Sequence, residues 1–243
     1  HWFHRRVARL LGIRVHMHGS VVRDRPVLIV SNHISWLDII VLSSIAPVSF
    51  IAKSEIDGWP MINAFARLQR TLFVNRNRRS EVKGKTQEIA ARLAAGDSLV
   101  LFAEGTSSDG NRVLPFKSSL FAALGNGADG SATGLVQTAT LVYTHMHGLP
   151  LNRNQKPAIA WYGDMDMLSH GWAFLRSGPI DVKVIISEPV SMSQFGDRKQ
   201  LSAFTERSVR NNFAAIMTAR RPAPVMLSHQ PGNEDNASQA GSQ

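Results

Sequence analysis

A histidine and an aspartate lie five residues apart between two apolar runs near the start of the chain. Residues 31–38 read Ser-Asn-His-Ile-Ser-Trp-Leu-Asp, and they follow the β-branched run 25–30 and precede the apolar run 39–42. This pattern predicts a buried strand followed by a helix. A carboxylate at Asp38 can fold back onto one ring nitrogen of His33, which fixes the tautomer and leaves the other nitrogen as a general base. His33 and Asp38 are therefore candidate catalytic residues.

Two further predicted strands end in polar side chains. The run 71–76 ends at Arg76, and the run 98–103 is followed by Glu-Gly-Thr at 104–106. A histidine–aspartate spacing alone is more typical of a loop histidine beside a solvated carboxylate. Open α/β sheets, however, bind ligands at the carboxyl ends of their strands, so three such ends together favour a polar substrate site.

Three ordered motifs resemble those of the glycerolipid acyltransferase family, which includes 1-acylglycerol-3-phosphate and related lysolipid acyltransferases. They are Asn-His-x-Ser-x-x-Asp at 32–38, Phe-Val-Asn-Arg at 73–76 and Glu-Gly-Thr at 104–106, and the resemblance covers roughly residues 20 to 190. It implies catalysis by His33 and Asp38. It also implies a set of substrate-binding residues, with Arg76 on a phosphate: Phe73, Arg76, Glu104, Gly105 and Thr106.

The resemblance further implies a reaction without an acyl-enzyme. His33 would take the proton from a lysolipid hydroxyl, which then attacks an acyl thioester carried by coenzyme A or acyl carrier protein. Asp38 would orient His33 and stabilise the imidazolium, as in hydrolase triads. Backbone N–H groups near His33 or Gly105 are candidates for binding the oxyanion. We expect no metal and no cofactor beyond the acyl-CoA or acyl-ACP co-substrate.

Two departures from the family pattern bear on the acceptor. Ser107 stands where the family usually has an arginine, and Gln137 and Thr138 stand where its fourth motif carries prolines. Either a phosphate contact is missing, or Arg112 or Lys117 supplies it, or the acceptor has no phosphate. We expect 1-acylglycerol-3-phosphate as the acceptor, in phospholipid biosynthesis, with lyso-ornithine lipid as the alternative.

Composition bounds the class of protein. The 243 residues are 44% hydrophobic and 19% charged, which is typical of one globular domain with a sizeable core. There is no cysteine, so thiolate nucleophiles and disulfides are excluded. The net charge of +9 favours an acidic partner: anionic membrane lipid, an acidic carrier protein or nucleic acid. No zinc-finger spacing or helix-turn-helix signal supports nucleic acid.

The segment 1–20 combines basic and apolar residues. On a helix its apolar side chains share one face, bordered by Arg5, Arg6 and Arg9; they are Trp2, Phe3, Val7, Leu10 and Leu11. This pattern suits the headgroup region of a membrane, although a helix packed on the domain would also show it. No run reaches the ~20 apolar residues of a spanning helix. We expect the protein at the cytoplasmic face of the bacterial inner membrane, peripheral or anchored by a segment outside this chain.

Alternating strand and helix patterns predict an α/β fold: a single domain at 21–221 with a central mixed β-sheet flanked by helices, as in glycerol-phosphate acyltransferases. The remaining strands are expected at 48–53, 134–144, 158–162 and 181–186, and the helices at 56–68, 79–95, 164–175 and 197–220. Gly96 is expected to stop the second helix. The Pro-, Ser- and Gln-rich tail 222–243 is expected to be disordered.

Two other classes of protein remain as alternatives. A serine esterase needs Gly-x-Ser-x-Gly, and residues 105–109 lack its final glycine. A non-catalytic protein that binds anionic membranes would explain the charge but not the His33, Asp38 and Glu104 arrangement. His145 and His147, two residues apart, are interpreted as loop histidines rather than metal ligands.

Overall fold

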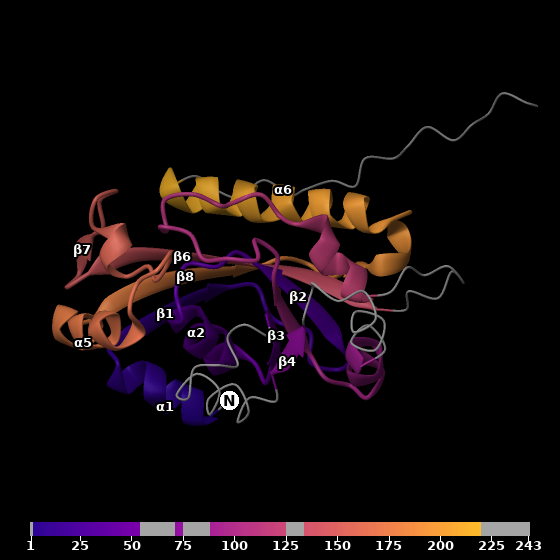
Figure 1. Ribbon diagram of the computed structural model, residues 1–243, viewed down its shortest axis with the longest axis horizontal. Coiled ribbons are helices and arrows are strands. Elements are labelled where there is room, and N and C mark those ends of the chain that lie inside the picture. The colour runs from indigo at the N-terminus through magenta and orange to yellow at the C-terminus, as the bar shows by residue number, and fades with distance from the viewer. Residues whose placement is uncertain (1, 54–70, 75–87, 125–133, 220–243) are drawn as a thin grey trace, which may run out of the picture.

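The computed structural model describes residues 2–53, 71–74, 88–124 and 134–219. Within them a nine-stranded sheet has the order β1-β8-β6-β2-β5-β3-β4, and β7 and β9 pair with β6 (Figure 1). The strands are β1 Ile13–His18, β2 Val27–Ser31, β3 Ser49–Lys53, β4 Leu72–Val74, β5 Leu99–Phe102, β6 Leu135–Met146, β7 Leu149–Pro150, β8 Ile180–Ile186 and β9 Val190–Ser191. β2 is parallel to β5 and to β6, whereas β6 and β8 are antiparallel. The predicted mixed α/β sheet is confirmed.

Helices cover both faces of this sheet. They are α1 Trp2–Leu10, α2 Leu37–Ile45, α5 Met167–Ser177 and α6 Arg198–Met217, with a helical stretch at 88–94 and 3₁₀ turns η2 Ser118–Leu124, η3 Lys156–Ala158 and η4 Met192–Gln194. One core cluster joins residues of α1, α2 and α5, and the other joins residues of α6 and η2. Figure 1 shows α6 along one side of the sheet and α1 and α2 along the other.

The central strand β2 shows why the sequence forms this architecture. All five of its residues are buried, as expected for a parallel strand with both faces covered. Neighbouring side chains point to opposite faces. Ile29 accordingly packs in the cluster under α1 and α2, and Leu28 packs in the cluster under α6. β2 is thereby fixed between two cores, and its carboxyl end is a rigid base for the loop that follows.

Helix ends largely follow local signals. Asp197 caps α6 by accepting hydrogen bonds from the backbone N–H groups of Lys199 and Gln200. Asp166 caps α5 in the same way through Ser169, so that helix begins at Met167 rather than at the predicted 164. Gly96, with φ of 95°, follows the helical stretch 88–94, as predicted.

Two predicted segments differ from the structure. Segment 1–20 is helical only over its first half: α1 ends at Leu10, Gly12 adopts φ of 69°, and the unpredicted strand β1 runs parallel to β8 at the edge of the sheet. The sheet therefore starts before the expected domain boundary at 21. β1 escaped detection because only Ile13 is buried in it. The expected strand at 158–162 is also absent: η3 ends at Ala158, and Ile159 and Ala160 are buried in the loop that follows it.

Several other expectations lie partly or wholly outside the described residues: the helix at 56–68, the start of the helix at 79–95 and the tail 222–243. Among the helices that the structure describes, none has the length and apolar character needed to cross a membrane.

Candidate active site

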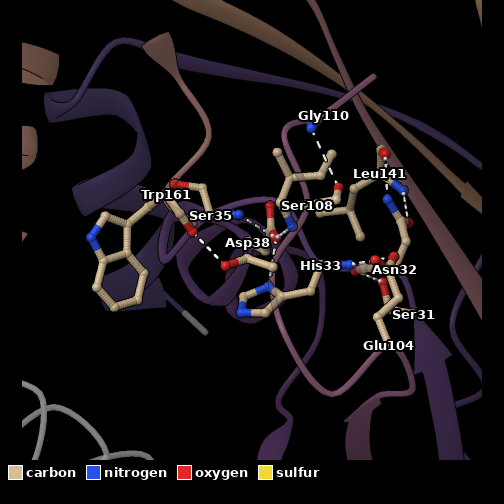
Figure 2. Close-up of polar contacts among 12 residues, drawn as sticks. Ser31, Asn32, His33, Ser35, Asp38, Glu104, Ser108, Gly110, Leu141 and Trp161 are labelled. Atoms are coloured by element: carbon tan, nitrogen blue, oxygen red, sulfur yellow. Dashed lines mark hydrogen bonds and ion pairs between the residues drawn. The ribbon is translucent and has the colours of Figure 1, made fainter. Parts of the chain in front are cut away.

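The candidate site lies at the carboxyl ends of β2 and β5. These strands are parallel neighbours, with Ser31 paired to Phe102, so the loops that follow them emerge side by side. The first loop contains His33 and leads into α2, and the second contains Glu104 (Figure 2). The structure thus brings the first and third sequence motifs together, as the strand patterns predicted.

His33 and Asp38 form a hydrogen-bonded pair. The His33 Nδ1 lies 2.8 Å from Oδ2 of Asp38, which is fully buried. The same carboxylate oxygen accepts the backbone N–H groups of Ile34 at 2.6 Å and Ser35 at 2.9 Å. Because Asp38 is in the first turn of α2, the helix dipole also favours its negative charge. The carboxylate is therefore fixed, and it fixes the orientation of the imidazole.

The His33 ring is held on a second side by an aromatic contact. It stacks on Phe102 with ring centroids 4.0 Å apart and an interplanar angle of 17°. The side chain keeps 18% of its exposure, and Nε2 makes no hydrogen bond to any residue in the described ranges. With Nδ1 engaged by Asp38, Nε2 is the nitrogen that can accept a proton from an incoming hydroxyl.

Asn32, next to the pair, joins its loop to β6. Its Nδ2 donates to the Leu141 carbonyl at 3.0 Å, and its Oδ1 accepts the Leu141 N–H at 2.9 Å. Both residues are buried, so these hydrogen bonds replace strand pairing that ends where β2 ends. Asn32 therefore anchors the backbone immediately before His33.

Glu104 braces the backbone of the same loop. Its Oε1 accepts the His33 N–H at 3.1 Å and its Oε2 accepts the Leu114 N–H at 3.2 Å. The side chain is 1% exposed, and burial raises its pKa from the ordinary 4.5 to about 8 against the opposing effect of the two N–H donors. Both oxygens contact protein backbone. The acceptor contact expected of Glu104 stays a prediction.

Four of the backbone N–H groups near His33 and Gly105, which were candidates for binding an oxyanion, make hydrogen bonds within the protein. The N–H of His33 donates to Glu104, those of Ile34 and Ser35 donate to Asp38, and that of Gly105 donates to the Phe102 carbonyl at 3.1 Å. These groups serve to shape the two loops. Thr106, which follows Gly105, is exposed beside the site.

Ser107, which replaces the family's arginine, contacts the protein itself. Its hydroxyl donates to the carbonyl of Trp161, and the Trp161 N–H donates to the Ile34 carbonyl at 3.0 Å. The loop 159–166 is thereby fastened to both motif loops, which explains why its apolar residues are buried without forming the predicted strand. Arg112 and Lys117, the alternative phosphate ligands, are exposed.

The second motif is described only in part. Phe73 lies in β4, where its backbone is in register with Ala52 of β3. The side chain of Phe73 and the whole of Arg76 lie outside the described residues. Their assignment to the acceptor stays a prediction.

Sequence reasoning missed one buried polar residue, Tyr143, and noted another, Gln137, only as a departure from the family pattern. The hydroxyl of Tyr143, in β6, donates to Oδ1 of Asp38 at 2.8 Å. Gln137, in the fourth-motif region, bonds to the backbone of Ser20, Val22 and Ser187. The available signal was a polar group within an otherwise apolar strand run. No group of three or more side chains suited to a metal occurs in the described part of the chain.

Comparison with known proteins identifies the family. The acyltransferase family model matches residues 12–127, starting at the glycine before β1. The chain is 49% identical over 221 residues to the lyso-ornithine lipid O-acyltransferase of Brucella abortus, covering 90% of this chain and 83% of the relative. It is 31% identical over 185 residues to the 1-acyl-sn-glycerol-3-phosphate acyltransferase of Neisseria gonorrhoeae, covering 76% and 68%.

A solved structure has the same fold. The crystal structure of the 1-acyl-sn-glycerophosphate acyltransferase PlsC from Thermotoga maritima matches with a TM-score of 0.63 and 24% identity, over 90% of this chain and 78% of that one. With the site at the ends of β2 and β5, these findings define a lipid-modifying transferase. The chain belongs to the lysolipid O-acyltransferase family.

Proposed function

We propose that this enzyme transfers a fatty acyl group from an acyl thioester to the hydroxyl of lyso-ornithine lipid. The similarity to the Brucella abortus enzyme of that name supports this acceptor. Ser107 also supports it, because this residue stands where the family places an arginine and its hydroxyl donates a hydrogen bond to the Trp161 carbonyl. The similarity to the Neisseria gonorrhoeae enzyme keeps 1-acylglycerol-3-phosphate, the acceptor expected first, as the second candidate.

The pairing of His33 with Asp38 is the observation that carries the reaction. His33 Nε2 accepts the proton of the acceptor hydroxyl as its oxygen attacks the thioester carbonyl. The carbon–sulfur bond then breaks, and the imidazolium returns the proton to the departing thiolate. Asp38 stabilises the imidazolium formed between these steps. The acceptor hydroxyl itself is the nucleophile, so no acyl-enzyme forms.

The donor in this proposal is acyl-CoA or acyl carrier protein. Both are acidic, and the net charge of +9 is complementary to either. Phe73, Arg76, Glu104, Gly105 and Thr106 are proposed to contact the acceptor. An ornithine headgroup carries a carboxylate, which the planar guanidinium of Arg76 can bind in two places.

The proposed location is the cytoplasmic face of the inner membrane, reached through α1. Trp2 and Phe3 are 68% and 57% exposed, and Leu10 is 86% exposed. The Arg6 guanidinium lies 4.5 Å from the Trp2 ring centroid, which places a cation beside an interfacial aromatic. These side chains suit a lipid headgroup region.

The test is acyl transfer from a labelled thioester to both lysolipids at one ionic strength. We expect transfer to lyso-ornithine lipid, lowered ~10²- to 10⁴-fold by His33→Ala. His18→Ala removes an exposed histidine of β1 and is the matched control. Acylation of 1-acylglycerol-3-phosphate alone by wild type would overturn the assignment of lyso-ornithine lipid as the acceptor. Near-normal turnover of His33→Ala would overturn the mechanism.

A further inference from the structure

Helix α5 has two faces of different character. Its inner side chains His170 and Phe174 are 6% and 2% exposed. On its outer side Leu168, Trp172 and Leu175 are 67%, 64% and 57% exposed, although all three are large and apolar. These three residues form the α5 apolar face. A monomeric globular protein rarely leaves several such side chains together in water, so the face calls for a partner.

The inner side of α5 contacts the catalytic loop. The indole Nε1 of Trp36 donates to Nδ1 of His170 at 3.2 Å, and the Trp36 ring meets the Phe174 ring edge-on with centroids 6.0 Å apart. Burial lowers the pKa of His170, which keeps the ring neutral and able to accept this hydrogen bond. Trp36 lies between His33 and Asp38 in the chain. Helix α5 is therefore fastened to the loop that holds the catalytic pair.

α5 and α1 belong to the same layer of the molecule. Ala8 of α1 and Phe174 of α5 pack in one core cluster on the face of the sheet opposite α6. The chain segments that follow the two helices also meet, because the Ile180 N–H donates to the Gly12 carbonyl at 3.0 Å. Two helices with exposed tryptophans thus lie on one side of the sheet, as Figure 1 shows.

The charges in these helices indicate which partner the face fits. Neither α1 nor α5 contains an acidic residue, whereas α1 contains Arg5, Arg6 and Arg9. In α5 the Arg176 guanidinium lies 6.0 Å from the Trp172 ring centroid. Apolar and tryptophan side chains bordered by arginines are complementary to an anionic bilayer surface, where the rings enter the headgroup region and the cations meet phosphates.

We propose that the α5 apolar face inserts into the headgroup region of an anionic bilayer and, with α1, docks the enzyme on the membrane. Because α5 holds Trp36, docking brings the His33–Asp38 loop to the surface in which a lysolipid acceptor resides. The inference rests on the proposed function for that acceptor. Its test measures membrane binding, which does not depend on turnover.

The first experiment compares partition onto vesicles of phosphatidylglycerol and phosphatidylcholine. Replacing Leu168, Trp172 and Leu175 together with serine should lower the partition coefficient at least about tenfold. Met217→Ser is the matched control, because Met217 is 46% exposed on α6, across the sheet. A triple variant that binds as tightly as wild type would overturn the proposal.

The second experiment leaves the apolar face nearly intact. Since the chain has no cysteine, Leu168→Cys and Met217→Cys each accept a single polarity-sensitive dye. Vesicles should shift the emission of the dye at 168 to the blue and leave that at 217 unchanged. Two results would overturn the proposal. The first is an unshifted emission of the dye at 168 on vesicle-bound protein. The second is an emission shift that follows protein concentration in the absence of lipid, which would indicate that a second copy of the chain covers the face. Vesicle binding through α5 by an enzyme that acylates neither lysolipid would contradict the proposed function alone.

Discussion

The hydroxyl of Tyr143 donates to Oδ1 of Asp38 at 2.8 Å, from a strand 105 residues further along the chain. Oδ2 of Asp38 accepts hydrogen bonds from His33 Nδ1 and from the backbone N–H groups of Ile34 and Ser35. Among the described residues, Tyr143 supplies the one hydrogen bond to Oδ1. Burial, and then the charge of Asp38, raises the pKa of Tyr143 well above its ordinary value. The phenol therefore stays a donor at any working pH and holds the plane of the carboxylate.

Replacing Tyr143 with phenylalanine should lower kcat/KM for acyl transfer by about tenfold. The ring still fills its site, while the carboxylate loses a hydrogen bond to a charged group worth ~1.5–3 kcal/mol. Loss of this contact lets Asp38 rotate and loosens the orientation of His33. The loss should fall on kcat rather than on KM, because Tyr143 is buried and acts through Asp38. Steady-state kinetics of the purified variant measure both.

Tyr162→Phe is the control for this substitution, since the chain contains only two tyrosines. It should leave kcat and the midpoint of thermal unfolding close to wild type. A Tyr143→Phe variant with unchanged kcat would show that the three donors to Oδ2 suffice to hold Asp38.

Glu104 predicts a pH dependence of stability. Its pKa is about 8 in the folded protein against an ordinary 4.5, so between these values the folded state keeps a proton that the unfolded state releases. The free energy of unfolding must fall as pH rises through this window, by a few kcal/mol at most. Thermal unfolding from pH 5 to pH 8.5 should show the fall in wild type and less of it in Glu104→Gln.

The two proteins should therefore converge as pH rises. At pH 5 Glu104→Gln should be the less stable, because an amide offers one oxygen to the N–H groups of His33 and Leu114. Glu188→Gln, which changes an exposed carboxylate, should keep the wild-type slope. A gap between wild type and Glu104→Gln that stays constant over the range would contradict protonation of Glu104.

The parts of the site predicted from sequence are those set by local chemistry. His33 and Asp38 are five residues apart, and a strand followed by a helix is enough to bring them together. Tyr143 and Leu141 reach the loop only because β6 lies beside β2 in the sheet, and no pattern within one strand specifies that order. Contacts between strands that are distant in sequence could therefore not be predicted.

The two misassigned segments, 158–162 and β1, show that burial alone does not identify a strand. Ile159 and Ala160 are 1% and 0% exposed, yet they lie in a loop that packs on the catalytic loop. A short apolar run reports burial and cannot separate a strand from such a loop. The strand β1 was missed for the opposite reason. An edge strand with one buried residue shows almost no alternation of buried and exposed side chains.

Asn32→Ala should destabilise the protein by about 2–4 kcal/mol. It leaves both the N–H and the carbonyl of Leu141 buried without their partner, and each unsatisfied group costs ~1–3 kcal/mol. Chemical denaturation measures this loss. Asn154→Ala, at an exposed position in the loop before η3, should change stability by less than ~0.5 kcal/mol. Equal stability of the two variants would show that water replaces the Asn32 side chain.

Charge on α1 should matter for membrane binding more than equal charge elsewhere. Replacing Arg5, Arg6 and Arg9 with glutamine should weaken binding to anionic vesicles by up to about a hundredfold at low salt, because each cation near such a surface contributes ~1 kcal/mol. The control removes three cations from the exposed side of α6, on the other face of the sheet: Arg198, Lys199 and Arg207, each to glutamine.

Both variants have the same net charge, so only the position of the charge differs between them. Added salt shortens the Debye length and screens the arginines of α1 from the lipid phosphates. It should therefore weaken vesicle binding by wild type and narrow the difference in affinity between wild type and the α1 variant. Arg5 also donates to the Ser44 carbonyl, so thermal unfolding must confirm that the α1 variant remains folded. If the α6 variant loses as much binding as the α1 variant, the membrane responds to total charge, and α1 does not face the lipid.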